Sequence, residues 1–107
     1  MLVLPIKRKW FDMIVSGEKT EEYREIKPYY DVRFESVFGC QWLFRGIKGI
    51  GNMEPPEKEI IFRNGYSKTA RQIKALCTLT IGKGKPEWGA EPGVTYYVLH
   101  IKKIKEA

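Results

Sequence analysis

The sequence lacks several features on which whole classes of protein depend. It has a single histidine, His100, and two widely separated cysteines, so neither a histidine-based catalytic triad nor a zinc site has enough side chains to form. No apolar run approaches the roughly 20 residues that a membrane-spanning helix needs. We therefore expect no metal, no cofactor and no membrane partner.

Two short motifs are also missing. The run GKGK at residues 82–85 has neither the glycine spacing nor the following Ser or Thr of a phosphate-binding loop. Residues 1–5 are too short for the apolar part of a signal peptide and have no charged segment before them. We therefore expect a cytoplasmic protein, in which Cys40 and Cys77 are free thiols.

The composition that is present favours one folded domain with an anionic partner. The 107 residues, of which 43% are hydrophobic, suffice for a single core, so residues 1–107 are predicted to form one domain. The chain has 19 Lys and Arg against 13 Asp and Glu, a net charge of +6. This excess favours anionic partners, with nucleic acid first among them.

The hydrophobic pattern predicts an α+β fold. Strands are expected at residues 2–5, 20–26, 59–62, 73–81 and 94–104, and helices at residues 8–16 and 28–39. Asn64-Gly65 is suited to a tight turn with a positive φ. Such a set of elements makes a small β-barrel of five to six strands with one or two packed helices.

The segment 39–57 is harder to assign. Four glycines interrupt its apolar cluster Trp42-Leu43-Phe44, and two prolines end it. It can be a strand followed by an excursion that covers one end of the barrel, or a surface for a protein partner. The pattern does not choose between them, so an interaction module stays open as a third class of function.

The stretch GEKTEEYR, residues 17–24, is the best candidate for a functional site. Gly17 suits the left-handed end of the preceding helix, which places Lys19 at a helix-to-strand corner, where we expect it to be partly exposed. Strand alternation puts Glu22 and Arg24 on one face. Lys19 and Arg24 then offer donors for phosphate or carbonyl oxygens, and Glu22 offers an acceptor for a base. Lys7 is expected to form a fourth wall of this cleft; the structural alternative is a plain ion pair between Glu22 and Arg24.

This stretch resembles a known signature. Gly17, Lys19, Glu22 and Arg24 form the pattern G-x-K-x-x-E-x-R, which is similar to that of the ASCH (activating signal cointegrator homology) domain. Residues 4–14 also resemble the opening strand and helix of that family, and the similarity is most specific over residues 2–26. The resemblance, to a compact bacterial or phage-type member, implies a PUA-like fold, in which a helix packs on a small β-barrel, and RNA binding.

The same resemblance suggests an enzyme as the alternative. Some compact ASCH-like proteins are amidohydrolases that act on N-acetylated cytidine, and their motif resembles G-x-K-T-x-T-x-R. Gly17, Lys19, Thr20 and Arg24 match it, but Glu22 stands where the second threonine, the nucleophile, is expected. Thr20 lies on the same predicted strand face and is the remaining hydroxyl. An RNA-cleaving activity with Lys19 and Glu22 as catalytic groups is a related possibility.

A second cluster of candidate residues lies at residues 63–71, a segment in which cations flank an aromatic residue and no acidic residue occurs. Its candidate ligand-binding residues are Arg63, Tyr66, Lys68 and Arg71. An aromatic ring among cations is typical of a single-strand binder, while a solvated hairpin with Tyr66 packed inward explains the run equally well. Trp88 can stack on a base too, although packing as the plug of the barrel is the preferred interpretation.

Together these patterns predict a small nucleic-acid-binding module. The expected partner is RNA or another single-stranded nucleic acid, or a nucleoside-like small molecule, bound in the cleft of Lys7, Lys19, Thr20, Glu22 and Arg24. A hydrolase that uses the same cleft is the alternative. Neither the ligand nor the oligomeric state follows from the sequence.

Overall fold

Five strands and two α-helices make up the part of the chain that the computed structural model describes, residues 1–39 and 56–107. In chain order the elements are β1 (Val3–Ile6), α1 (Arg8–Val15), β2 (Glu21–Glu25), α2 (Pro28–Phe38), β3 (Lys58–Asn64), β4 (Gln72–Lys83), a 3-10 turn (Pro86–Trp88) and β5 (Thr95–Glu106). Residues 40–55, which include Cys40 and the cluster at residues 42–44, lie outside the described residues. The alternatives given for the segment 39–57 therefore stay predictions.

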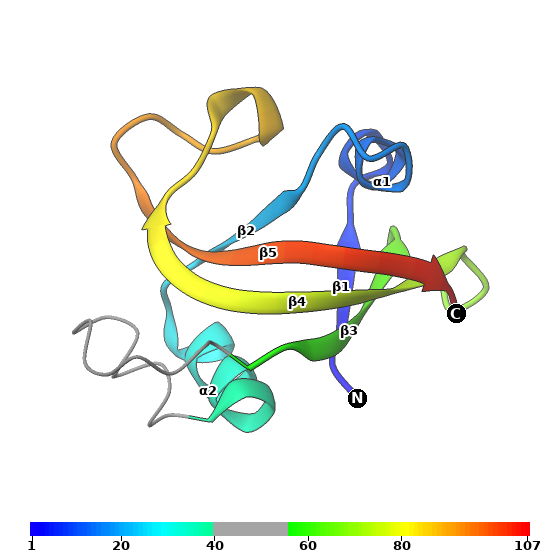
Figure 1. The fold of residues 1–107 in the computed structure, drawn as a ribbon, viewed down its shortest axis with the longest axis horizontal. Coiled ribbons are helices and arrows are strands. Elements are labelled where there is room, and N and C mark those ends of the chain that lie inside the picture. Colours follow the sequence, from blue (N-terminus) through cyan, green and yellow to red (C-terminus); the bar gives the residue numbers. More distant parts are fainter. Residues whose placement is uncertain (40–55) are drawn as a thin grey trace.

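The strands form one sheet in the order β1-β3-β4-β5-β2. β1 runs parallel to β3, and the other neighbours are antiparallel. The long strands β4 and β5 curl together, with a bulge between Leu76 and Cys77, so the sheet bends into half a barrel (Figure 1). The α+β prediction with five to six strands is confirmed at this level. None of the helices in the described ranges is long and apolar enough to cross a membrane.

Both helices begin and end close to where the pattern predicts. α1 is followed by Gly17, whose φ of +84° is the left-handed conformation that glycine adopts without strain. α2 starts at Pro28, where the missing N–H costs nothing, and stops before Gly39 at φ +88°. In the view of Figure 1, α1 and α2 lie on opposite sides of the β4–β5 hairpin.

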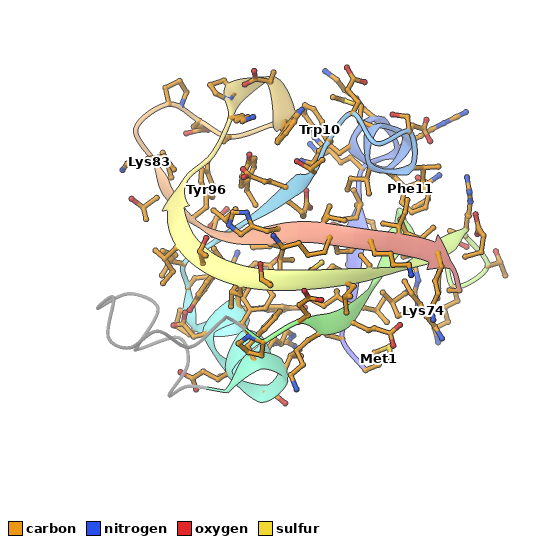
Figure 2. The ribbon with its side chains drawn as sticks, viewed as in Figure 1. Met1, Trp10, Phe11, Lys74, Lys83 and Tyr96 are labelled. Carbon is orange, nitrogen blue, oxygen red and sulfur yellow. The ribbon has the colours of Figure 1, made fainter. Side chains whose placement is uncertain are left out.

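The core lies between these helices and the inner face of the curled sheet. Phe11 and Ile14 enter it from α1, and Phe34 and Phe38 enter it from α2. Figure 2 shows the side chains on the ribbon, with Lys74 and Lys83 near the two ends of β4. Cys77 is a buried free thiol, as predicted, and burial raises its pKa to about 12.

The connection between β3 and β4 differs from the tight turn that Asn64-Gly65 suggests. Gly65 does have a positive φ, +88°, but Asn64 is still the last residue of β3. The Asn64 N–H donates to the Arg71 carbonyl at 2.9 Å, so a longer loop of residues 65–70 closes the hairpin. The Gly65 N–H bonds instead to the carbonyl of Ile6 at 2.9 Å. This contact ties the loop to the end of β1, beside the predicted site.

Candidate functional site

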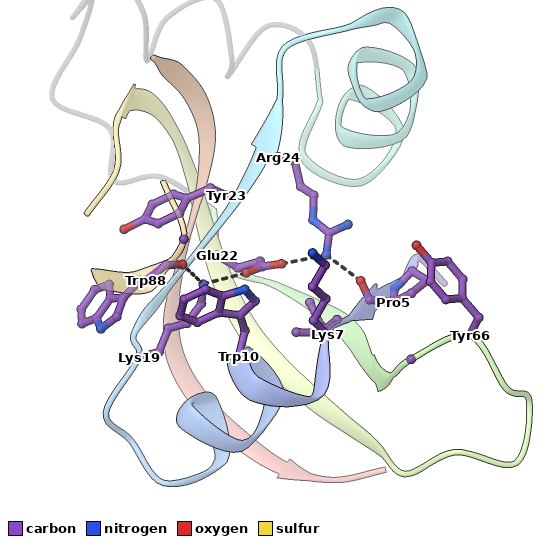
Figure 3. Close-up of a pocket in the computed structure, with 12 residues that line it drawn as sticks. Pro5, Lys7, Trp10, Lys19, Glu22, Tyr23, Arg24, Tyr66 and Trp88 are labelled. Atoms are coloured by element: carbon purple, nitrogen blue, oxygen red, sulfur yellow. Dashed lines mark hydrogen bonds and ion pairs between the residues drawn. The ribbon is translucent and has the colours of Figure 1, made fainter. Parts of the chain in front are cut away.

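A pocket of about 260 Å³ opens between the N-terminus of α1, strand β2, the loop after β3 and the 3-10 turn (Figure 3). Five of the predicted site residues line it: Lys7, Lys19, Glu22, Arg24 and Tyr66. The expected convergence of the four charged residues on one concave surface is therefore confirmed.

Glu22 is the centre of the charged part of the pocket. The Lys19 ammonium lies 3.0 Å from Glu22 Oε1, and Arg24 Nη2 donates to Glu22 Oε2 at 2.7 Å. The ion pair within β2 thus forms, and Lys19 adds a second cation to the same carboxylate. An ionised carboxylate offers about four acceptor positions on its two oxygens, so Glu22 keeps acceptor capacity for a ligand.

Lys19 forms the floor of the pocket and is not displayed at its surface. Its side chain is only 1% exposed, so the expectation of partial exposure is wrong. The ammonium donates to the Trp88 carbonyl at 2.6 Å and lies 4.8 Å from the Trp10 ring centre and 5.2 Å from that of Tyr23. Aromatic rings attract a cation and at the same time exclude water. Burial lowers the pKa of Lys19, and the nearby Glu22 carboxylate opposes that shift.

Arg24 links the pocket to two other elements. Its Nη2 also donates to the Pro5 carbonyl of β1 at 2.8 Å, and its Nη1 donates to the Tyr30 hydroxyl of α2 at 3.1 Å. Its Nε is buried and has no acceptor among the described residues. These contacts fix the direction of the guanidinium, so the pocket wall depends on how β1 and α2 pack.

Lys7 and Tyr66 lie at the mouth of the pocket, one on each side of the contact between Ile6 and Gly65. Lys7 is exposed and precedes α1 directly. The side chain of Tyr66 is 87% exposed, so the interpretation in which Tyr66 packs inward is wrong. The loop of residues 65–70 therefore presents an aromatic ring beside the cations of the predicted motif (Figure 3).

The cations of the second predicted cluster, at residues 63–71, do not line the pocket. Arg63, Lys68 and Arg71 are absent from the lining of this pocket, and Arg71 forms an ion pair with Glu106 at the end of β5. Of the four candidate residues in that run, only Tyr66 lines the pocket.

Thr20 does not line the pocket, so the expectation that it joins Glu22 in the cleft is wrong. β2 begins at Glu21, one residue after Thr20. Its side chain is exposed, and its carbonyl accepts from the Ile101 N–H at 2.9 Å. No group of three or more His, Cys, Asp or Glu side chains that is able to hold a metal occurs among the residues described.

Three more aromatic residues line the pocket: Trp10, Tyr23 and Trp88. Sequence reasoning missed the first two and named Trp88 as a ring that can stack on a base, with packing preferred. Trp10 is partly buried: it packs on the core with one part and lines the pocket with the rest. Trp88 is not a buried plug; it is half-buried and holds Lys19 through its carbonyl. Trp88 follows a glycine-rich loop with no pairing signal, so only the folded chain shows what it faces.

Tyr23 is the residue that holds the 3-10 turn against β2. Its hydroxyl donates to Glu21 Oε1 at 2.7 Å and accepts from the Lys85 N–H at 2.9 Å. The approach is close, because a Cβ on Gly84 would lie 2.8 Å from the Tyr23 ring. β2 is an edge strand of the sheet, so residues of both its faces reach the pocket that lies along this edge.

A comparison of the chain with protein-family models, curated proteins and solved structures found no match. The resemblance to the ASCH family therefore stays a prediction. What the site can do has to follow from the charges, rings and dimensions of the pocket.

Proposed function

We propose that this pocket binds one base of a single-stranded RNA, or a modified nucleoside. The protein would then be a cytoplasmic nucleic-acid-binding module with a PUA-like fold of the ASCH type. The observation that carries the proposal is the convergence of Lys7, Lys19, Glu22 and Arg24 with four aromatic side chains in one pocket. A base needs flat apolar walls for its faces and donors and acceptors for its edge.

The size of the pocket supports a single base or nucleoside. Pockets for drug-sized ligands run from about 300 to 1,000 Å³, and this one has about 260 Å³. A duplex cannot enter such a pocket, because its bases are stacked and paired inside the helix. Single-stranded RNA, whose bases can turn outward, is the form that fits.

The chemistry of the walls supports recognition of a base edge. Glu22 accepts hydrogen bonds, whereas Lys19 and Arg24 donate them, so both kinds of group on a base edge find a partner. A carboxylate repels phosphate, and Glu22 would weaken a site that only bound the RNA backbone. Its position therefore favours contact with N–H groups of a base, each good pairing being worth about 1–3 kcal/mol of discrimination.

Tyr66→Ala tests the stacking contact at the mouth. We expect the affinity for a short single-stranded RNA to fall about tenfold or more, because base–aromatic stacking contributes about 1–3 kcal/mol per base. The ring is 87% exposed, so its loss should leave the thermal stability unchanged. Fluorescence anisotropy with labelled oligonucleotides measures the affinity.

Tyr29→Ala is the matched control. Tyr29 is 51% exposed on α2 and does not line the pocket, so its removal should leave RNA affinity unchanged. The proposal fails if Tyr66→Ala binds like the natural protein, or if a duplex of the same sequence binds as tightly as the single strand. If RNA binding is lost only when Arg63, Lys68 and Arg71 are neutralised, the RNA-binding surface is the β3–β4 hairpin and not the pocket.

A hydrolase that uses the same pocket is the second candidate function, an amidohydrolase on a modified cytidine or an RNA-cleaving enzyme. One observation favours it: burial lowers the pKa of Lys19, and lysines perturbed in this way cluster at catalytic sites. What weighs against it is the missing nucleophile. Amide hydrolysis through a covalent intermediate needs an activated hydroxyl or thiol, and among the described residues that line the pocket only Tyr23 and Tyr66 carry a hydroxyl and none carries a thiol.

We expect no turnover of N-acetylcytidine by this protein, because Glu22 stands where the nucleophile is needed and both its oxygens are engaged by cations. Liquid chromatography of the nucleosides after prolonged incubation measures any cytidine formed. Lys19→Met serves as the blank for a contaminating enzyme. Cytidine release by the natural sequence that disappears in Lys19→Met would establish the hydrolase instead.

A further inference from the structure

The pocket carries an excess of positive charge. Among the described residues, the charged side chains that line it are three cations, Lys7, Lys19 and Arg24, against the one carboxylate of Glu22. Two of these cations share the carboxylate, and the third is left over. A neutral base makes no use of this excess, which has to be offset by solvent ions while the pocket is empty.

Lys7 is the cation that has no partner. Lys19 and Arg24 each contact Glu22 and a backbone carbonyl, whereas the ammonium of Lys7 has no carboxylate, carbonyl or ring partner among the described residues. Its neighbour Arg8 differs, because it lies 3.8 Å from Asp12 on the solvent side of α1. Lys7 instead points into the mouth of the pocket, on the same side as Arg24 (Figure 3).

We infer that the ligand is a nucleotide whose phosphate lies at the mouth against Lys7, an inference that rests on the proposed function. The interior cannot take the phosphate, because Glu22 would repel it there. The mouth can, because Lys7 offers an unshared ammonium and solvent reaches the site from outside. The base would lie between the aromatic walls with its edge at Glu22, Lys19 and Arg24, and the phosphate would pair with the excess positive charge of Lys7.

The test compares ligands with and without a phosphate on the full chain. The probes are the four common ribonucleosides, their 3′- and 5′-monophosphates, and inorganic phosphate, titrated by calorimetry or by NMR chemical shifts. We expect at least one monophosphate to bind about tenfold more tightly than its nucleoside, since charge-assisted hydrogen bonds are among the strong ones. Lys7→Gln should bring that ratio close to one. Lys103→Gln, which removes an exposed lysine of β5 outside the pocket, should leave the ratio unchanged.

The outcomes separate this inference from the function it rests on. If nucleosides bind and the phosphate adds nothing, the phosphate contact is overturned while base binding stands. Inorganic phosphate that binds as tightly as the monophosphates would make this a plain anion site, which overturns the inference too. If neither nucleosides nor single-stranded RNA bind, the proposed function fails and the inference falls with it.

Discussion

Replacing Glu22 by glutamine is expected to lower the free energy of unfolding by about 3–5 kcal/mol, the cost of leaving buried charge without its counter-charge. Glu22 is the common partner of two cations, at 3.0 Å from Lys19 and 2.7 Å from Arg24. The side chains of Glu22 and Lys19 are 8% and 1% exposed, so water cannot replace the lost carboxylate. Urea denaturation followed by circular dichroism measures the change.

Lys19→Met is expected to cost much less stability than Glu22→Gln, and this difference would identify Glu22 as the shared counter-charge. Methionine fills a similar volume, and Glu22 still has Arg24, so one cation and one carboxylate remain paired; the loss should be about 1 kcal/mol or less. Glu59→Gln is the control for an exposed pair, because Glu59 lies 3.8 Å from Lys105 at the surface, where such pairs contribute about 0–1 kcal/mol. Equal losses in Glu22→Gln and Lys19→Met would show that the carboxylate is not the shared counter-charge.

Much of the charged centre was predictable because its geometry is local. Gly17 ends α1, and strand alternation places Glu22 and Arg24 together, so a few residues determine the relation between Lys19 and its carboxylate. The same short-range patterns gave the helices and most strand positions. Those predictions needed only helical and strand periods, which the chain carries in its own sequence.

The burial of Lys19 was not predictable in this way. It depends on Trp88, whose carbonyl is 69 positions away in the sequence and lies in the connection between the paired strands β4 and β5. The place of Tyr66 depends in turn on the contact between the Gly65 N–H and the Ile6 carbonyl. Neither contact leaves a periodic signal. A charged residue at a helix-to-strand corner is therefore expected to be exposed, until the distant loop that covers it is known.

Phe34→Ala is expected to cost about 3–5 kcal/mol of stability, the usual loss for an aromatic side chain removed from a close-packed core. Phe34 has no exposed surface, and its ring lies 4.9 Å from that of Tyr97 and 5.7 Å from that of Tyr30. The pocket should respond as well, because Tyr30 accepts the hydrogen bond from Arg24 Nη1 at 3.1 Å. Losing Phe34 removes the surface against which the Tyr30 ring stacks.

Two variants on the same helix separate core packing from this coupling. Val32→Ala changes a side chain that is 64% exposed and should shift stability by about 0.5 kcal/mol or less. Tyr30→Phe removes only the hydroxyl that holds Arg24, a loss of about 1 kcal/mol. If α2 positions the guanidinium, Phe34→Ala and Tyr30→Phe should both weaken RNA binding at a temperature where each is fully folded, and Val32→Ala should not. A Phe34→Ala protein that is destabilised yet binds RNA normally would show that the Arg24 wall is held by Glu22 and the Pro5 carbonyl without help from α2.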